Sequence, residues 1–322
     1  ALSAAVAVFF VGSVLPCGCS VTFLALIPKQ SAPKSFAGFR PIIFCNFSNK
    51  IISKILATRL EEILPPLNSP NQRGFVKGRA ISDNILLAQE MISRIGRKVR
   101  GSNVVLKLDM AKAYDRVSWM FLLSVMRKFG FGEVWLDMVW RLVSSCHFSV
   151  LINGGPVGFF RSTRGLRQGD PLSPALFIIM AEFLSRGLES LPLSSGFIPY
   201  SVPSGGSPPV HLGYADDVII FCNGGRASVR QVMGVLTDYQ RVSGQLVNAS
   251  KSCCLLSKKV SGLRSRRVAE ETGFARKSLP ITYLGCPLYE GRRSKSLFAG
   301  IIDKVQARLL SWQNRWLSRG RG

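Results

Sequence analysis

Two adjacent carboxylates lie between two short apolar runs at residues 210–222, VHLGYADDVIIFC. Val, Ile, Tyr and Phe favour strands, whereas Gly213 and the Asp216–Asp217 pair favour a reversal. The stretch therefore predicts a β-hairpin that carries both carboxylates at its exposed tip. Because like charges this close repel each other, an apolar hairpin needs a divalent metal ion, a lysine or an arginine beside them. The alternative is a solvated turn, since Asp is a common turn residue.

A third carboxylate ends another apolar strand, because NVVLKL at residues 103–108 leads directly to Asp109. Between the two carboxylate sites, residues 165–174 (GLRQGDPLSP) form a Gly-rich basic turn that opens a helix. Asp109 and Asp216 are far apart along the chain. Only neighbouring strands of one sheet would bring them together.

The order of these blocks resembles the palm of reverse transcriptases: an aspartate after a strand, a QG turn with its helix, and a YADD hairpin. The amino-acid sequences of five stretches resemble those of reverse transcriptases from plant-like, non-LTR (LINE-type) retrotransposons. These stretches are residues 26–29 (LIPK), 39–42 (FRPI), 72–79 (QRGFVKGR), 167–174 (RQGDPLSP) and 283–288 (YLGCPL). The resemblance runs from about residue 9 to the last residue, and five ordered blocks are far more specific than YADD alone.

The resemblance implies an α+β fold of the right-hand polymerase type, with fingers, a palm of antiparallel sheet and helices, and a partial thumb. We expect the N-terminal segment and fingers at residues 1–100 and the palm at 101–280. A primer-grip hairpin and a first, truncated thumb helix would occupy residues 281–322. The apolar run at residues 1–15 is too short to span a bilayer and resembles the entry to the fingers, so we expect the chain to begin inside a longer polyprotein.

The implied activity is RNA-directed DNA polymerisation, in which two magnesium ions activate a 3′-hydroxyl and stabilise the departing pyrophosphate. The resemblance assigns Asp109 and Asp216 as the main metal ligands and Asp217 as a third, supporting carboxylate. Magnesium prefers hard oxygen ligands of this kind, and manganese is an alternative ion. The implied partners are an RNA template, a DNA primer or nicked target DNA, and deoxynucleoside triphosphates.

The resemblance also assigns residues to the incoming nucleotide. Tyr114 would lie under the sugar and exclude a 2′-hydroxyl, although an ordinary core tyrosine is the alternative. Gln168 would touch the sugar or base, and Gly169 would permit close backbone approach. Tyr214 and Ala215, directly before the carboxylate pair, are further substrate-binding candidates.

Several cations are candidates for phosphate contacts. Arg40 would bind the triphosphate, with a structural ion pair or a template contact as the alternative. Lys251 would donate a proton to the departing pyrophosphate, or else be a phosphate-facing surface lysine. Residues 71–79 contain Arg73, Lys77 and Arg79 with two glycines, so backbone and cations could approach a phosphate chain.

The composition agrees with a nucleic-acid partner. The chain carries 42 Lys and Arg against 18 Asp and Glu, a net charge of +24, whereas solubility needs a charge of only roughly 2–8. The eight cysteines show no paired spacing for zinc, and several lie in apolar strands, which favours reduced buried thiols over disulfides. We therefore expect a nuclear or cytoplasmic ribonucleoprotein, not secreted and without a membrane partner.

Apolar spacing predicts several helices, of which four concern the fingers, the QG turn and the thumb. The first covers residues 49–65, ends at the Pro65–Pro66 pair and buries Ile51, Ile52, Ile55, Leu56, Leu60 and Ile63. The second covers residues 82–94 and buries Ile85, Leu86, Ala88 and Ile92. The third is capped by Ser173 and buries Leu176, Phe177, Met180, Phe183 and Leu184. The fourth, at residues 297–312, is amphipathic and would lie along the product duplex.

Two other functions stay open at this point. One is another right-hand polymerase, such as an RNA replicase or an intron maturase. The other is a catalytically decayed or domesticated domain that binds RNA through its charge alone. The nucleotide preference in primer extension distinguishes a reverse transcriptase from another polymerase. Comparing the extension activity of the wild type with that of Asp216→Asn distinguishes an enzyme from a binding domain without catalysis.

Overall fold

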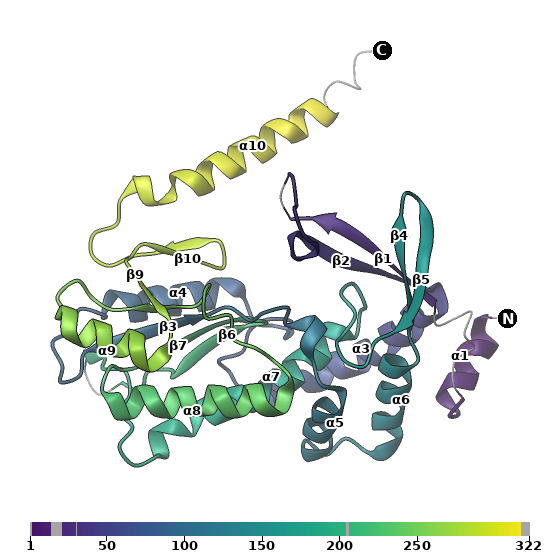
Figure 1. Ribbon diagram of the computed structural model, residues 1–322, viewed down its shortest axis with the longest axis horizontal. Helices are drawn as coiled ribbons and strands as arrows, with labels where there is room; N and C mark the ends of the chain where they lie inside the picture. The colour runs from purple at the N-terminus through teal and green to yellow at the C-terminus, as the bar shows by residue number, and fades with distance from the viewer. Residues whose placement is uncertain (1, 14–20, 30, 204–205, 317–322) are drawn as a thin grey trace.

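A computed structural model describes residues 2–13, 21–29, 31–203 and 206–316 (Figure 1). A five-stranded sheet forms the centre, in the order β6-β7-β3-β8-β9, and is antiparallel except where β8 pairs with β9. Its strands are β3 (Asn103–Leu108), β6 (His211–Tyr214), β7 (Asp217–Asn223), β8 (Cys253–Leu255) and β9 (Ala275–Lys277). The mixture of a largely antiparallel sheet with helices agrees with the α+β class that the sequence predicts.

Helices cover both faces of this sheet, which explains why β3 and β7 are almost continuously apolar. Val104, Leu106 and Leu108 join a large core with the helices on one side, and Val105 joins a second core on the other side. Figure 1 shows α7 and α8 below the sheet and α4 above it. The helices around this sheet are α4 (Ile81–Ser93), α5 (Trp119–Lys128), α7 (Ser173–Glu189), α8 (Arg226–Ser243) and α9 (Gly262–Thr272).

A second sheet of four strands, in the order β2-β1-β4-β5, lies at the other end of the molecule (Figure 1). Its strands are β1 (Val21–Pro28), β2 (Phe39–Cys45), β4 (His147–Ile152) and β5 (Gly155–Arg161), and helices α1 (Leu2–Phe10), α3 (Phe47–Leu67) and α6 (Glu133–Ser144) lie near it. The sheets draw on both sides of residue 100, where the sequence analysis places the boundary between fingers and palm. Strands β4 and β5 come from after that boundary, whereas α4 comes from before it and packs on the five-stranded sheet.

A two-stranded hairpin, β10 (Ile281–Tyr283) and β11 (Cys286–Leu288), follows the five-stranded sheet, and α10 (Ala299–Trp316) projects beyond it (Figure 1). The apolar side chains predicted for this helix are largely exposed, with Ile302 at 49% and Val305 at 53%. Packing against the rest of the chain therefore does not account for that stripe. The predicted side-chain role of Trp312 and the chain end at Arg319–Gly322 lie outside what the structure describes, as do residues 14–20 of the predicted fingers entry.

Three details of the helix predictions were wrong. Helix α3 continues through Pro65 and Pro66 to Leu67, because proline's fixed φ is helical and its missing N–H costs least near a helix end. Ser173 does not cap α7; the Asp170 carboxylate instead accepts from the Leu172 N–H at 2.9 Å. The side chains of Ile63, Leu86 and Phe183 are exposed. Leu86 is two residues from the buried Ala88, so at 3.6 residues per turn it faces away from the packed side of α4.

Five cysteines whose side chains the structure describes are free, namely Cys146, Cys222, Cys253, Cys254 and Cys286, and the first four of them are buried. Burial raises the pKa of the Cys222 thiol to about 12, which keeps it protonated and unreactive. Every helix of the described residues is too short or too polar to cross a bilayer.

Candidate active site

The carboxylates are positioned by two paired strands at the centre of the five-stranded sheet. Strands β3 and β7 run antiparallel, and Leu108 is paired with Val218. Because the strands are antiparallel, the next position of this register places Asp109 opposite Asp217, the first residue of β7. The sequence prediction that neighbouring strands of one sheet bring Asp109 and Asp216 together is confirmed, because β3 pairs with β7 and both carboxylates line one cleft.

The hairpin turn is tighter than predicted. Tyr214 pairs with Asp217 across the hairpin, so Ala215 and Asp216 alone form the turn and Asp217 is the first residue of β7. Ala215 has a φ of 55°, a left-handed conformation that a non-glycine residue seldom adopts. Gly213 lies within strand β6 and does not mark the reversal.

A cleft of about 770 Å³ brings together seven of the ten predicted site residues. They are Arg40, Asp109, Tyr114, Gln168, Gly169, Asp216 and Lys251. This volume is in the range typical of small-ligand sites. The remaining three, Tyr214, Ala215 and Asp217, belong to the β6–β7 hairpin but do not line the cleft.

The electrostatics of the hairpin follow from partial burial and repulsion. Burial is the main cause that raises the pKa of Asp216, and the nearby charge of Asp109 raises it further. The Asp216 side chain reaches solvent, but the concave cleft around it displaces part of its water. Burial likewise raises the pKa of Asp217, against the opposing charge of Lys107. Asp216 and Asp217 are thus carboxyl groups whose local environment disfavours the charged form.

The nucleotide-facing candidates have well-defined supports. The Tyr114 ring stacks on Phe177 of α7, with centroids 4.9 Å apart and planes 10° from parallel. Burial, followed by the charge of Asp216, raises the pKa of the Tyr114 hydroxyl, which therefore stays protonated. Gly169 has a φ of 102°, and a Cβ there would lie 3.3 Å from the Ile43 carbonyl oxygen. Glycine is therefore favoured at this point of the cleft wall.

The segment that carries Lys251 is bonded directly to the strand end that carries Asp109. The Asn248 N–H donates to the Asp109 carbonyl oxygen at 2.8 Å, and the Asp109 N–H donates to the Ser252 hydroxyl oxygen at 3.0 Å. The Ala111 N–H donates to the Leu246 carbonyl oxygen at 2.8 Å. These bonds hold both Asp109 and Lys251 at the same cleft.

The acidic residues fit a divalent ion only in part. Within the described ranges, no three Asp, Glu, His or Cys side chains gather closely enough to hold a metal ion on their own. Asp109 and Asp216 both line the cleft and supply hard oxygen atoms. Because magnesium is commonly held by one or two carboxylates together with substrate phosphates, these two residues fit the ion as a pair that substrate would complete.

A sequence profile of the family "Reverse transcriptase (RNA-dependent DNA polymerase)" matches residues 27–288, which contain the five-stranded sheet, most of the four-stranded sheet and every cleft-lining residue except Leu26. The chain belongs to the reverse transcriptase family. The prediction made from the ordered sequence blocks is confirmed.

Two relatives of this reverse transcriptase come from transposable elements. The chain is 28% identical over 246 residues to the transposon TX1 uncharacterized 149 kDa protein of Xenopus laevis, which covers 75% of this chain and 18% of that protein. It is 28% identical over 237 residues to the Pol polyprotein of the type-2 retrotransposable element R2DM of Drosophila melanogaster, covering 74% of this chain and 21% of that protein. The chain thus spans about a fifth of these relatives' length. The resemblance to non-LTR retrotransposons is confirmed.

Solved structures show the same fold at low sequence identity. The telomerase of Candida albicans, in complex with the TWJ fragment of telomeric RNA, matches with a TM-score of 0.58 and 14% identity. The match covers 89% of this chain and 48% of that one. The agreement supports the right-hand polymerase architecture.

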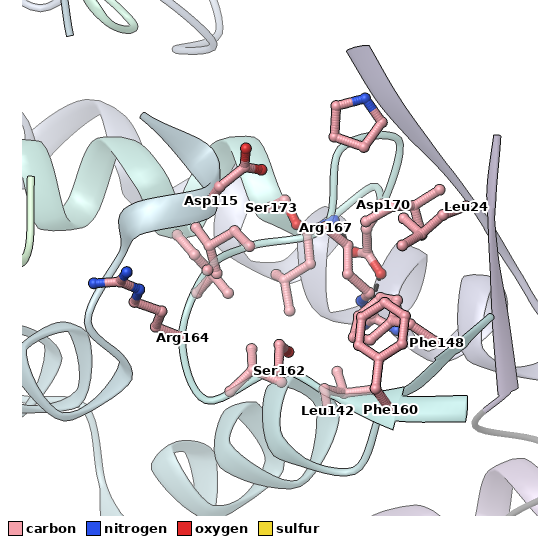
Figure 2. A pocket seen from close by; sticks show the side chains of 17 residues that line it. Leu24, Asp115, Leu142, Phe148, Phe160, Ser162, Arg164, Arg167, Asp170 and Ser173 are labelled. Carbon is pink, nitrogen blue, oxygen red and sulfur yellow. Dashed lines mark hydrogen bonds and ion pairs between the residues drawn. The ribbon is translucent and has the colours of Figure 1, made fainter. Parts of the chain in front are cut away.

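A second cavity of about 230 Å³ lies behind the cleft wall of this reverse transcriptase, and Figure 2 shows its mostly apolar lining. An ion pair between Arg167 and Asp170, 2.7 Å apart, is buried at its edge. Pro41, Asp115, Arg167 and Ser173 line both this cavity and the cleft. The cleft wall at the QG turn is therefore a single layer of residues.

Sequence reasoning missed several residues of the cleft. Asp115 lines the cleft although it is not among the predicted site residues, and its carboxylate accepts a hydrogen bond from the Gln168 amide at 3.3 Å and so orients that side chain. Lys29, Lys112 and Asn248 also line the cleft. Lys29 ends the LIPK block and Lys112 follows Asp109 closely. Their positions in or beside recognised stretches were the sequence signal that could have identified them as cleft residues.

Proposed function

We propose that this reverse transcriptase extends a DNA 3′-end on an RNA template by nucleotidyl transfer, as a step of retrotransposition. The observation that carries the proposal is the single cleft shared by Asp109, Asp216, Tyr114 and Gln168. The cations Arg40 and Lys251 line the same cleft and suit the phosphates of a deoxynucleoside triphosphate.

In this proposal Asp109 and Asp216 would hold two magnesium ions, or manganese in their place, with Asp217 as a supporting carboxylate. The chemistry that such ions supply when bound is activation of the 3′-hydroxyl and stabilisation of charge on the departing pyrophosphate. Tyr114 blocks a 2′-hydroxyl by its bulk, and Gln168, oriented by Asp115, contacts the sugar or base.

The other predicted residues act on the phosphates and on the backbone of the site. Arg40 binds the triphosphate. Lys251 donates a proton to pyrophosphate as it leaves, an effect worth roughly 10²–10⁴-fold in rate when the geometry is right. Gly169 lets the backbone approach the nucleotide closely, while Tyr214 and Ala215 support the nucleotide site from the catalytic hairpin.

The proposed domains are the fingers at residues 1–100, the palm at 101–280, and the primer grip with the first thumb helix at 281–322. The RNA template and the DNA primer or nicked target would lie in the groove between them. The enzyme would act in a nuclear or cytoplasmic ribonucleoprotein.

Primer extension on a short RNA–DNA hybrid tests this function. The wild-type chain should extend the primer with deoxynucleotides and a divalent ion. Asp216→Asn should lose at least about 10²-fold in rate, as expected for a group that acts in the transition state. Equal rates in the two proteins, or no extension by the wild type, would leave a binding domain without catalysis. Preference for ribonucleotides would favour an RNA replicase.

A further inference from the structure

The basic block at residues 71–79, predicted to meet phosphates, has most of its charge directed inward. Arg73 is paired with Asp83 at 2.7 Å. The Arg79 guanidinium donates to four backbone carbonyls, those of Pro65, Asn68, Ser69 and Gln72. Of the three cations in the block, only Lys77 has an exposed side chain. The block is therefore built to hold its own backbone in one shape.

That shape is fitted to the outer edge of the catalytic hairpin. The Arg73 N–H donates to the Gly213 carbonyl oxygen at 3.0 Å, and the Gly213 N–H donates to the Asn71 carbonyl oxygen at 2.9 Å. The side-chain amide of Asn84, from α4, donates to the same Gly213 oxygen at 2.9 Å. Residues 71–73 thus extend the sheet beyond β6 and cover the edge that β6 would otherwise expose.

The side chain of Gln72 reaches past this edge to the turn. Its Oε1 accepts from the Ala215 N–H at 3.1 Å and from the Gly74 N–H at 2.9 Å, and the residue is only 3% exposed. Ala215 holds the left-handed φ of 55° and directly precedes Asp216. The buried Gln72 oxygen therefore stabilises the left-handed backbone of Ala215, which in turn sets the position of the Asp216 carboxylate.

Gly74 explains how the block can lie so close. A Cβ on Gly74 would be 2.4 Å from the Ala215 nitrogen and 3.0 Å from the Tyr214 carbonyl carbon. Both are backbone atoms, so the clash could be relieved only by moving the turn or the block. The contact depends on glycine at this position.

We propose that residues 71–74 are a brace for the catalytic turn and that Gln72 is a positioning residue, which sets where Asp216 stands relative to Asp109. The inference rests on the proposed polymerase function of the same site. According to this inference, residues 72–74 (QRG) position the catalytic turn, and Lys77 remains the exposed cation of the block.

The test compares Gln72→Met, which keeps the length but removes the acceptor, with Asn223→Leu as the matched control. Asn223 is also buried, at 2% exposure. Its side chain likewise makes two bonds to backbone, to Arg100 and Gly225, at the far end of β7. Three quantities are measured for each protein: the kcat of primer extension, the thermal midpoint, and amide hydrogen exchange of the metal-free protein in peptides that cover residues 212–218.

We expect Gln72→Met to lose about 10–100-fold in kcat, the size seen when a residue that orients a ligand is removed. The KM for the nucleotide should change less, and exchange at the turn should become faster. Both Gln72→Met and Asn223→Leu should lower the thermal midpoint, by similar amounts. Asn223→Leu should nevertheless keep the wild-type kcat and the wild-type hydrogen exchange at the turn. Gln72→Glu keeps an acceptor for both N–H groups, so its kcat should fall between those of Gln72→Met and the wild type. Gly74→Ala should lower kcat as Gln72→Met does.

The brace is refuted if Gln72→Met and Asn223→Leu have the same kcat, or if exchange at the turn is unchanged in Gln72→Met. If the wild-type chain extends no primer, the proposed polymerase function fails. The exchange measurement then still decides whether Gln72 holds the turn.

Discussion

The two sheets of this reverse transcriptase differ in how much of their apolar surface is covered. In β7 every residue from Val218 to Asn223 is buried, and in β3 only Lys107 is not fully buried. In β5, by contrast, every residue from Pro156 to Arg161 is exposed, and Val157, Phe159 and Phe160 are among them. The central strands that lead to the carboxylates, β3 and β7, are closed on both faces, whereas β5, at the edge of the other sheet, offers aromatic and aliphatic side chains to solvent.

This difference indicates a division of work between a rigid support and a contact surface. Catalytic groups must be held within a fraction of an ångström, which a doubly covered sheet provides. Exposed aromatic side chains beside cations suit an unpaired nucleic-acid strand, because bases stack on rings while phosphates meet the charges. On this view the four-stranded sheet is left open because its cover is nucleic acid.

The largest expected effect tests the support. Leu106→Ala removes a fully buried side chain from β3 and should lower the free energy of unfolding by about 2–5 kcal/mol. Val157→Ala, in the open β5, should change it by no more than about 0.5 kcal/mol. Denaturant unfolding of both variants measures the contrast. Similar losses in the two proteins would break the comparison.

A smaller effect is expected where the two sheets meet at the cleft. Tyr114→Ala should raise ribonucleotide incorporation relative to deoxynucleotides by about 10–100-fold, a range typical of steric discrimination in a pocket. Tyr114→Phe keeps the ring that stacks on Phe177 and should keep the preference. Competitive single-nucleotide extension gives the ratio. If Tyr114→Ala remained selective, the tyrosine would be only a core residue.

The sequence predicted the strands that carry the carboxylates better than it predicted the surroundings of Arg79 and of α10. Asp109 directly follows the apolar strand β3 and Asp216 directly precedes the apolar strand β7, and strand pairing then leaves few ways to join them. Local patterns could not predict the direction of the Arg79 side chain, because a cation in a Gly-rich block has the same sequence signature whether it meets solvent or carbonyls. Nor could they reveal the exposure of α10, because an amphipathic stripe does not say what covers it.

The open sheet should bind single-stranded RNA through its exposed rings. Phe159 is 63% exposed and stacks on His147, with centroids 4.7 Å apart. Phe159→Ala should weaken binding by about 1 kcal/mol, the lower end of base–aromatic stacking, and leave the thermal midpoint unchanged. Fluorescence anisotropy with a labelled RNA measures the affinity. Ile63→Ala, on the exposed part of α3, is the control; an equal loss there would remove the special role of the open sheet.

The smallest effect concerns pH and the closed sheet. Because burial and the charge of Asp109 raise the folded-state pKa of Asp216, its ionised form opposes folding above that pKa, and the opposition disappears as pH falls below it. Asp216→Asn should therefore have a higher thermal midpoint than the wild type at pH 8, and the gain should shrink toward pH 4. Asp238→Asn removes an exposed carboxylate paired with Arg241 on α8, and it should give no such gain. A difference between Asp216→Asn and the wild type that stayed constant across this range would mean that the carboxylate is not destabilised by its surroundings, and the rigid sheet would then hold its catalytic charge without cost to folding.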